Sequence, residues 1–529
     1  MKLKLILPIL PLIFLIAICT ESCKKNLEET AYSFLSGNTV FSNEAGLKEA
    51  TLGVYDSWRA DPNFDPFYQW VLAECGQQYV TAGQSGDGMI TPFYGFEETP
   101  SDLNITNVWS RYYQTIARAN TVIAHANQAV SDTNKANIYI AEARFHRAYA
   151  YFMLVRDFGG VPLITTEVNS IAQKDLIYAS QSPVQDVYNF IIQDLQFAET
   201  HLPPFWKGND LGRISAGAAK ALLGKVYLTG AGLPLQNAQY YQLAVQKLSE
   251  IVGSGEATYN FGLLPNFSDV FSDNNRKNKE VVFAWTNLWT ETYSHNGIIL
   301  PYFLFPTGLV GTPTQSVYGL TSAFYNLYET TDTRADMTAI SRYISQPSGD
   351  SIIYDPTIHH YINKTQGGSV VGNTLFSYTG MAYGKFGRTP LSPTQAAVPT
   401  DYSTDLIQMR FSDVLLCLAE ALNETGQTAQ AIPLLNRVRA RANASEYSVG
   451  SQDEVRAEIR KERRLELTGE YTTVYDIRRW GTLKDEIAAM NPAQILNNAL
   501  APYSAKLELY PIPQKELDAN PNLKQNPGW

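Results

Sequence analysis

Residues 141–163 read AEARFHRAYAYFMLVRDFGGVPL, and this stretch is the starting point for the fold. Apolar side chains recur in it at the three- and four-residue spacing of an α-helix, and the pattern extends back to Ile138. Gly159 and Gly160 end the periodicity, and Pro162 reinforces the stop. The pattern predicts a long helix that ends at Gly159.

Further helical stretches lie on both sides of this helix. One runs toward it from Ile105, and the first of the chain starts at Asn43, whose side chain can cap a helix N-terminus. A later stretch opens after Ser182 and is closed by Pro203. The helical pattern therefore covers much of the first half of the chain.

Two pairs of amphipathic segments resemble tetratricopeptide-like units. Such units are helix pairs of about 34 residues with alternating small and large side chains, and they stack to bury their apolar faces. We therefore predict a mainly α fold built on a tetratricopeptide-like helix-pair scaffold. The paired segments are residues 216–232 with 240–252 and residues 409–426 with 430–442.

Two parts of the chain do not show this helical pattern. Residues 75–103 are rich in Gly, Thr, Ser and aromatic residues and predict a long ordered loop, a kind of segment that is often functional. Residues 258–404 contain one clear helical run, at 321–329, and alternating runs at 280–287 and 351–357 that predict short strands. Because this part is too aromatic for disorder, we expect an irregular subdomain packed on the scaffold.

The N-terminus predicts secretion and a lipid anchor. Two lysines precede an apolar run that contains two prolines and is shorter than the roughly 20 residues that cross a bilayer. A bacterial lipoprotein signal ends at a cysteine preceded by a small residue, which fits Ser22 and Cys23 better than Ile18 and Cys19. We predict lipidation at Cys23, with Cys19 or cleavage without a lipid as the alternatives.

Composition narrows the classes of function and of fold. The 529 residues include 41 basic and 51 acidic side chains, and no long basic run argues for nucleic acid as a partner. After processing, only Cys75 and Cys417 remain, too few for a disulfide scaffold, so a hydrophobic core must supply stability. The 32 tyrosines suit buried cores and polar-ligand surfaces equally.

Several blocks, in order, resemble the SusD/RagB family of outer-membrane lipoproteins from Bacteroidetes. The chain departs from the family at His146, where an apolar residue is usual, and at Tyr471 and Thr473, where the family usually has glycine and arginine. The departures at Tyr471 and Thr473 put a local ion-pair network in doubt, but not the fold. The blocks are SCKKNLEE (22–29), WSRYYQTIARANTVI (109–123), residues 141–163, GRISAGAAKALLGKVYL (212–228), MRFSDVLLCLAEALNE (409–424), RKERRLELTGE (460–470), DIRRWG (476–481) and LYPIPQKELDANPNLKQNPGW (509–529).

The resemblance implies four tetratricopeptide-like helix pairs that carry a looped ligand-binding face. It also implies a non-enzymatic protein without a cofactor, held on the outer membrane by its lipid and facing outside. The expected partners are a glycan and a TonB-dependent transporter of the SusC type. The expected parts are a signal peptide (1–22), a tether (23–42), an N-terminal helical region (43–257), the irregular subdomain (258–404) and a C-terminal helical region (405–529).

Glycan sites combine aromatic faces with polar side chains, and two loop clusters fit this description. Tyr79 is the nearest match to a stacking tryptophan of the family's starch-binding member, with Gln78 as its polar neighbour and Tyr94 and Phe96 nearby. Each aromatic residue could instead pack in a core. The second cluster supplies Trp289, Tyr302 and Tyr318 as ligand candidates, whereas Trp58, Trp109 and Trp480 fall in helices and are expected in the core.

Other chemistries have weaker support. His359 and His360 are adjacent, so they point in different directions and make a poor metal pair. A two-carboxylate glycosidase remains an alternative, although Glu142, Glu420 and Glu466 lie on predicted helices beside arginines and are better explained as ion pairs. A peptide-binding tetratricopeptide module is the other alternative, and it would need an open concave groove.

Overall fold

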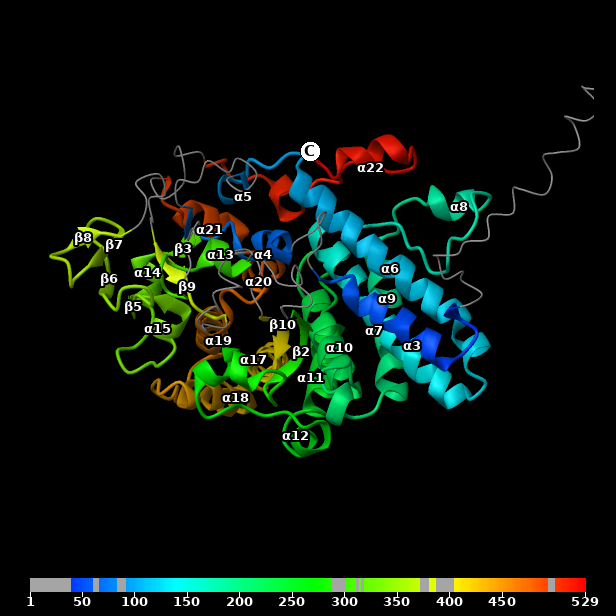
Figure 1. Ribbon diagram of the computed structural model, residues 1–529, viewed down its shortest axis with the longest axis horizontal. Coiled ribbons are helices and arrows are strands. Elements are labelled where there is room, and N and C mark those ends of the chain that lie inside the picture. Colours follow the sequence, from blue (N-terminus) through cyan, green and yellow to red (C-terminus); the bar gives the residue numbers. More distant parts are fainter. Residues whose placement is uncertain are drawn as a thin grey trace, which may run out of the picture.

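Helices dominate this computed structural model, as predicted (Figure 1). No helix in the described part of the chain is long and apolar enough to cross a bilayer. The predicted signal peptide, Cys19 and Cys23 lie outside that part. The described residues are 40–59, 66–82, 92–287, 300–310, 314, 318–371, 380–386, 404–492 and 500–529.

The scaffold is a series of long helices, each packed on its neighbour. α6 packs on α7, α7 on α9, α9 on α10 and α10 on α11, and α11 then meets α17, which is far away in the sequence. Figure 1 shows α3, α6 and α7 side by side at one end of the molecule. The helices are α3 (Glu44–Asp56), α6 (Leu103–Ala129), α7 (Thr133–Phe158), α9 (Val184–His201), α10 (Ala216–Ala231), α11 (Gln239–Ser249), α17 (Phe411–Glu424), α18 (Thr428–Arg441) and α19 (Gln452–Leu467).

The predicted helix ends are confirmed by their backbone chemistry. The Asn43 side chain accepts a hydrogen bond from the Gly46 N–H at 3.1 Å and so caps α3. α7 ends at Gly159, whose φ of 74° lies in the left-handed region that favours glycine. A Cβ there would also lie 2.8 Å from the end of the Leu509 side chain, which can move, so the backbone conformation is the reason that this turn needs glycine.

Short helices complete the helical part, and the sequence pattern missed α4. Nearly every residue of α4 is buried, Trp70 completely, so no polar face marks it as a surface helix. The short helices are α4 (Pro66–Glu74), α5 (Pro92–Gly95), α8 (Lys174–Ile177), α12 (Ser254–Tyr259), α13 (Leu300–Leu304), α14 (Ser322–Tyr325), α15 (Ala335–Thr338), α20 (Thr473–Arg479), α21 (Leu483–Ala489) and α22 (Gln514–Ala519), with 3₁₀ turns at Gly208–Asp210, Phe267–Phe271, Asp273–Asn275 and Ala505–Glu508.

The irregular region contains small antiparallel sheets. The predicted strands at 280–287 and 351–357 are confirmed as β2 and β6. Strand orders are β1-β3-β9-β4, β10-β2 and β5-β6-β7-β8. The strands are β1 (Val80–Ala82), β2 (Val281–Thr286), β3 (Tyr318–Leu320), β4 (Ala339–Ile340), β5 (Arg342–Ile344), β6 (Ser351–Asp355), β7 (His360–Asn363), β8 (Ser369–Val370), β9 (Met381–Tyr383) and β10 (Asp405–Arg410).

The helix predicted at residues 321–329 is wrong in length. Thr321 caps a single turn, α14, and the helix then ends because the N–H groups of Leu327 and Tyr328 bond three residues back, to Phe324 and Tyr325, instead of four. The Tyr328 hydroxyl donates to the Leu465 carbonyl at 2.8 Å, which fixes the end of this segment on α19.

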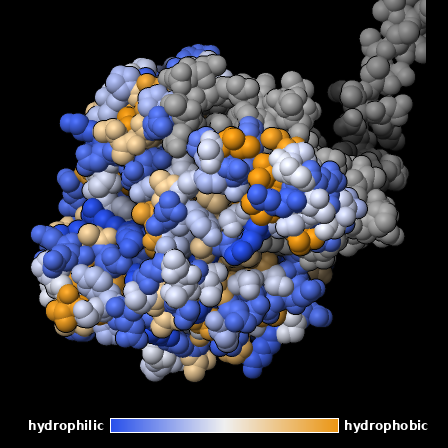
Figure 2. Space-filling view, turned by 90° about the vertical axis from the view of Figure 1, so that its left-hand side faces the viewer, coloured by the Kyte–Doolittle hydropathy of each residue, from blue (hydrophilic) through white to orange (hydrophobic). Residues whose placement is uncertain are grey.

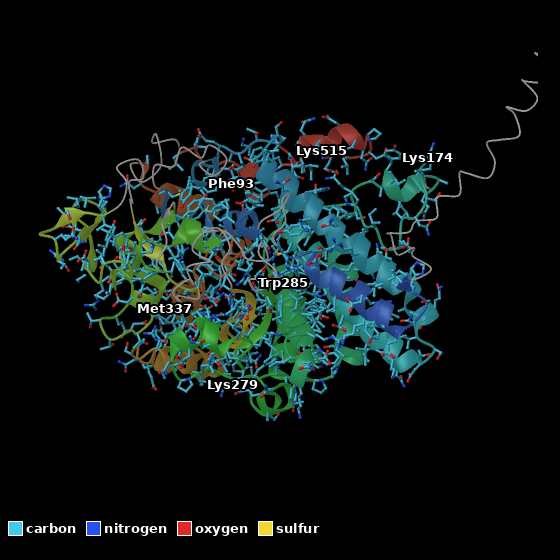
Figure 3. The ribbon with its side chains drawn as sticks, in the orientation of Figure 1. Phe93, Lys174, Lys279, Trp285, Met337 and Lys515 are labelled. Atoms are coloured by element: carbon cyan, nitrogen blue, oxygen red, sulfur yellow. The ribbon has the colours of Figure 1, made fainter. Side chains whose placement is uncertain are left out.

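One continuous core joins the scaffold to the irregular region. Trp58 and Trp285 stack with ring centroids 4.9 Å apart and planes 3° apart, and Figure 3 places Trp285 near the middle of the molecule. Trp58 and Trp109 are buried, as predicted. Cys75 and Cys417 are free and buried. The core therefore includes residues from segments far apart in the chain.

A buried ion network also joins the two parts. Arg410, at the start of α17, contacts Glu280, Glu466 and Glu470, and all four side chains are at most 7% exposed. Arg334 of the irregular region contacts Glu466 as well, at 2.7 Å. The prediction that Glu142, Glu420 and Glu466 form ion pairs with arginines is confirmed, and the structure identifies Arg213 as the partner of Glu142 and Arg479 as that of Glu420.

The departure at Tyr471 and Thr473 lies beside this network. Tyr471 adopts a φ of 61°, a conformation that ordinarily favours glycine. The Thr473 hydroxyl donates to the buried Glu74 carboxylate at 2.7 Å, and the Thr472 N–H donates to the same group at 2.8 Å. Neutral donors thus contact Glu74 at this turn.

Buried carboxyl groups are expected to make stability depend on pH. Burial raises the pKa of Glu74 and of Glu98 from 4.5 to about 7. A raised pKa stabilises the folded state below the unfolded value of 4.5, and this contribution is lost as the pH rises through about 7. The free energy of unfolding, measured by urea denaturation, should fall by up to about 3 kcal/mol per group between about pH 5 and about pH 8.

The neighbouring glutamate provides a matched control for this pH dependence. Glu98→Gln should remove the part of the pH dependence of the unfolding free energy that Glu98 contributes. Glu97→Gln changes an exposed residue and should leave the pH dependence as it is in the unaltered protein. An unchanged pH profile in Glu98→Gln would contradict the assignment.

Candidate functional site

A cleft of about 540 Å³ contains both polar and aromatic side chains, including two predicted site residues. Gln78 and Tyr79, which follow α4, form one wall. Leu327 and residues of α19 and of the α20–α21 region form the rest: Arg460, Lys461, Arg464, Trp480, Thr482, Asp485, Glu486 and Ala489.

The end of the molecule that carries β5–β8 is mainly hydrophilic, with hydrophobic residues in small groups (Figure 2).

Tyr79 is half-buried, and a backbone hydrogen bond and packing of its ring hold it in place. Its carbonyl accepts a hydrogen bond from the Thr321 N–H at 2.9 Å, and its ring packs against Phe324 with centroids 5.8 Å apart. The guanidinium of Arg464 lies 5.0 Å from the ring centroid. The structure thus places Tyr79 at a cleft wall beside a cation.

Trp480 is the second aromatic residue of the cleft, and its predicted place in the core is wrong. It is the C-cap of α20 and is only half-buried. Its indole N–H donates to Glu420 at 2.8 Å, which fixes the ring, and Arg460 lies 4.9 Å from the ring centroid. The side chain projects from a short helix end, and helical periodicity does not determine which face of such an end is covered.

Charged groups surround the two rings. Arg464 forms an ion pair with Glu486, and the Gln78 backbone N–H approaches the other carboxylate oxygen at 3.4 Å. Burial lowers the pKa of Arg460, and its Nε has no hydrogen-bond partner among the described residues. Asp485 and Lys461 are exposed at the rim.

This arrangement suits a ligand with many hydroxyl groups. Aromatic rings offer apolar faces, while guanidinium, carboxylate and amide groups supply donors and acceptors. A small number of polar groups in a concave, partly aromatic surface can orient a ligand. The cleft therefore has the chemistry that the glycan hypothesis requires.

The other predicted ligand residues are placed differently. Tyr94 and Tyr318 are completely buried and stack on each other, with centroids 4.9 Å apart and planes 15° apart. Because each ring face lies in the core, we correct their assignment from ligand contacts to packing residues. Trp289 and the side chain of Tyr302 lie outside the described residues, and Phe96 is buried.

Sequence reasoning missed Trp480, Arg460 and Arg464 as site residues. Arg460 and Arg464 lie four residues apart on α19, so the helical pattern places them on one face, but it does not say what that face meets. In the described part of the chain, no group of three or more His, Cys, Asp or Glu side chains could hold a metal ion.

A larger hollow of about 850 Å³ lies between α3, the 208–213 segment and β2. Tyr55 and Trp285 contribute to its walls, but both are engaged in the core: the Tyr55 hydroxyl donates to Glu142, and Trp285 is 3% exposed. Trp285 is buried and the Tyr55 hydroxyl is already bonded, whereas the cleft with Tyr79 and Trp480 contributes two half-buried rings, so that cleft is the stronger candidate.

Comparisons with known proteins cover almost the whole chain. A model described as SusD family matches residues 238–529, and one described as starch-binding associating with outer membrane matches residues 25–228. SusD-like protein P2 of Formosa agariphila is 29% identical over 532 residues, which cover 98% of this chain and 99% of that protein.

Solved structures share the fold. A SusD homolog from Bacteroides thetaiotaomicron has a TM-score of 0.76 at 23% identity, covering 92% of this chain and 97% of that one. A laminarin-binding SusD-like protein has a TM-score of 0.71 at 26% identity, covering 92% and 100%. Surface glycan-binding protein A from Bacteroides fluxus has a TM-score of 0.73 at 22% identity, covering 92% and 100%. With a SusD model matching more than half of its residues, the chain belongs to the SusD family.

Proposed function

We propose that this protein is a non-enzymatic, cell-surface glycan-binding lipoprotein that delivers oligosaccharide or polysaccharide to a SusC-like TonB-dependent transporter. The observation that carries the glycan proposal is the cleft in which half-buried Tyr79 and Trp480 lie beside unlike charges. Family membership and the names of similar proteins, which include laminarin-binding and surface glycan-binding proteins, support the same ligand class.

Capture rather than cleavage is the proposed mechanism. Stacking on the rings and hydrogen bonds from charged side chains would hold sugar units weakly, and several such contacts along a polymer add through effective concentration. The two adjacent carboxylates of the cleft belong to Asp485 and Glu486. Glu486 forms an ion pair with Arg464, which fits a role in binding rather than in cleavage. Trp289 and Tyr302 remain proposed contacts beyond this cleft.

Affinity electrophoresis against a polysaccharide panel that includes starch and laminarin tests the proposal. Retardation by at least one glycan, without new reducing ends in a parallel assay, is the expected result. New reducing ends would overturn the non-enzymatic claim. Binding of peptides but no glycan would favour a peptide-uptake protein of the same architecture.

Membrane attachment is proposed to depend on Cys23. We expect Cys23→Ser to move nearly all of the protein from the membrane fraction to the soluble fraction, because several acyl chains provide firm anchorage that the serine cannot carry. Fractionation with labelling by a palmitate analogue measures this. Cys19→Ser is the matched control and should remain labelled, and the reverse pattern would assign the anchor to Cys19.

A further inference from the structure

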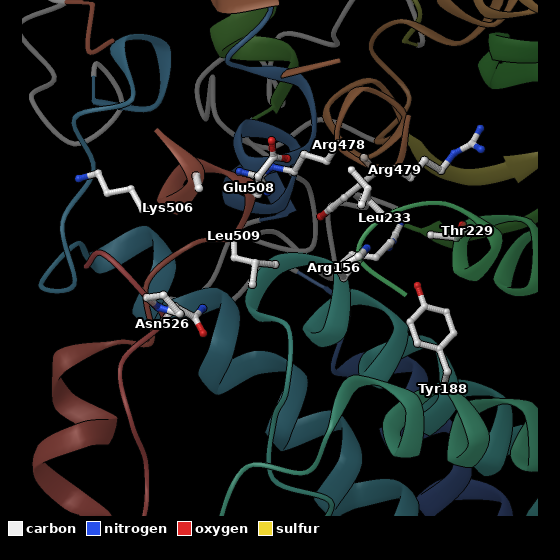
Figure 4. A pocket seen from close by; sticks show the side chains of 14 residues that line it. Arg156, Tyr188, Thr229, Leu233, Arg478, Arg479, Lys506, Glu508, Leu509 and Asn526 are labelled. Atoms are coloured by element: carbon white, nitrogen blue, oxygen red, sulfur yellow. The ribbon is translucent and has the colours of Figure 1, made fainter. Parts of the chain in front are cut away.

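A third pocket, of about 250 Å³, lies beneath the C-terminal tail (Figure 4) and shares no lining residue with the glycan cleft, although Arg479 of its wall precedes Trp480 of the cleft. Its walls are largely apolar and include Leu233, Pro234, Leu509 and Pro527. The ends of α7, α10 and α20 and the start of α9 meet around it. The volume suits a small organic molecule or one side chain rather than a polymer.

Arg156 supplies a positive charge to this pocket without a neutralising ion pair. It is only half-buried, and no carboxylate of the described residues lies within ion-pair distance of it, although burial raises the pKa of the neighbouring Asp157 and the Arg156 charge lowers it. Its Nε donates to the Phe152 carbonyl at 3.2 Å, and its guanidinium carbon lies 3.8 Å from the centroid of the Tyr475 ring. Nη1 makes no hydrogen bond in the described part of the chain, so it is available to a ligand.

Tyr188 supplies an unused hydrogen-bond donor. The residue is 1% exposed, yet its hydroxyl has no hydrogen-bond partner among the described residues and is not sealed from the pocket. Figure 4 shows this hydroxyl pointing into the pocket, toward the side where Arg156 and Thr229 lie. Burial raises the pKa of Tyr188, and the charges of Arg156 and Arg479 lower it, so the hydroxyl is protonated and within their field.

The other charged groups of the wall are turned elsewhere. Arg479 is neutralised by Glu420 and Asp476 and extends away from the pocket in Figure 4. Glu508 accepts a hydrogen bond from the Tyr503 hydroxyl at 3.0 Å, and Lys506 lies over the Trp529 ring. Arg478 also lines the pocket, but it is buried and its Nη2 donates to the Leu507 carbonyl at 3.1 Å, so the half-buried Arg156 is the more accessible positive charge of the wall.

We propose that this pocket binds a small organic anion, with Arg156 and the Tyr188 hydroxyl holding its carboxylate and Leu233, Pro234 and Leu509 packing on its apolar body. A guanidinium and a phenol both donate, and charge-assisted hydrogen bonds to carboxylate are stronger than those between neutral groups. This inference does not depend on glycan binding at the cleft.

Isothermal titration calorimetry of the full chain with butyrate, benzoate and 3-phenylpropionate, each beside its neutral amide, tests the proposal. At least one acid should bind saturably and about tenfold more tightly than its amide. N-acetyl-glycyl-phenylalanine distinguishes the C-terminus of another chain from a free acid as the source of the carboxylate. No saturable binding of any acid, or equal affinity for acid and amide, would overturn the proposal.

Tyr188→Phe is the sharpest variant, because it removes one hydroxyl and keeps the ring. It should weaken binding of the acid about tenfold and leave binding of the amide nearly unchanged. Arg156→Met, which keeps an apolar stem, should abolish the preference for the acid. Tyr178→Phe, at a position 41% exposed, is the matched control and should bind as the unaltered protein does. An acid preference that survives both Tyr188→Phe and Arg156→Met would refute the assignment.

Discussion

Glu466→Gln is expected to destabilise the folded protein by about 3 to 5 kcal/mol, the usual cost of breaking a buried ion pair from one side. Glu466 is 0% exposed and contacts Arg410, Arg334 and Arg441. Burial alone would raise the pKa of Glu466, but the three guanidinium charges outweigh it and hold the pKa well below its usual value. The amide keeps the shape of the side chain and leaves these charges without their shared partner.

Urea denaturation at neutral pH, followed by circular dichroism, measures this effect. Asp453→Ala is the matched control, because it removes a carboxylate from the same helix where the side chain is 88% exposed and pairs with Arg456. Exposed pairs contribute about 1 kcal/mol or less, so the control should unfold close to the unaltered protein. A Glu466→Gln midpoint equal to that of the control would contradict the role given to the network.

Tyr79→Ala and Trp480→Ala are each expected to weaken glycan binding about tenfold, or about 1.4 kcal/mol. Each substitution removes an aromatic face from the cleft and leaves the charged side chains in place. The effects should add in the double variant if the two rings contact separate sugar units. Affinity electrophoresis or calorimetry with the glycan identified in the panel measures the change.

Two controls separate binding from folding. Tyr178→Ala removes an exposed ring elsewhere in the chain and should bind glycan normally. Circular dichroism should show that the Trp480→Ala protein is folded, since Glu420 retains its ion pair with Arg479 after the indole hydrogen bond is lost. Unchanged affinity in both folded variants would remove this cleft from the proposal.

Local patterns predicted the long helices well. The Asn43 cap and the Gly159 turn involve residues close in sequence, so their chemistry can be seen without a tertiary structure. α4 was missed because it is buried on all sides, and the run at 321–329 was overextended because the Tyr328 hydroxyl bonds to Leu465, 137 residues away. Contacts between residues so far apart in the sequence leave no periodic pattern along it.

The candidate site also shows what prediction from the sequence cannot reach. Gln78 and Tyr79 were chosen from loop composition, and both line the cleft. Tyr94 and Tyr318 were chosen by the same criterion, but they stack on each other in the core. A tyrosine in a loop has the same composition signal in either place, because burial depends on what packs over the ring.

The sequence by itself determined the helical class, several ends of the long helices and the family resemblance, since capping residues, periodicity and ordered motifs are properties of nearby positions. Only the tertiary structure decided which aromatic rings remain accessible and which charges stay paired. Trp480 and Tyr79 line the same cleft although about 400 residues separate them, and Arg410 bonds to Glu280 across 130 residues. Such contacts depend on how whole elements pack, which no local pattern encodes.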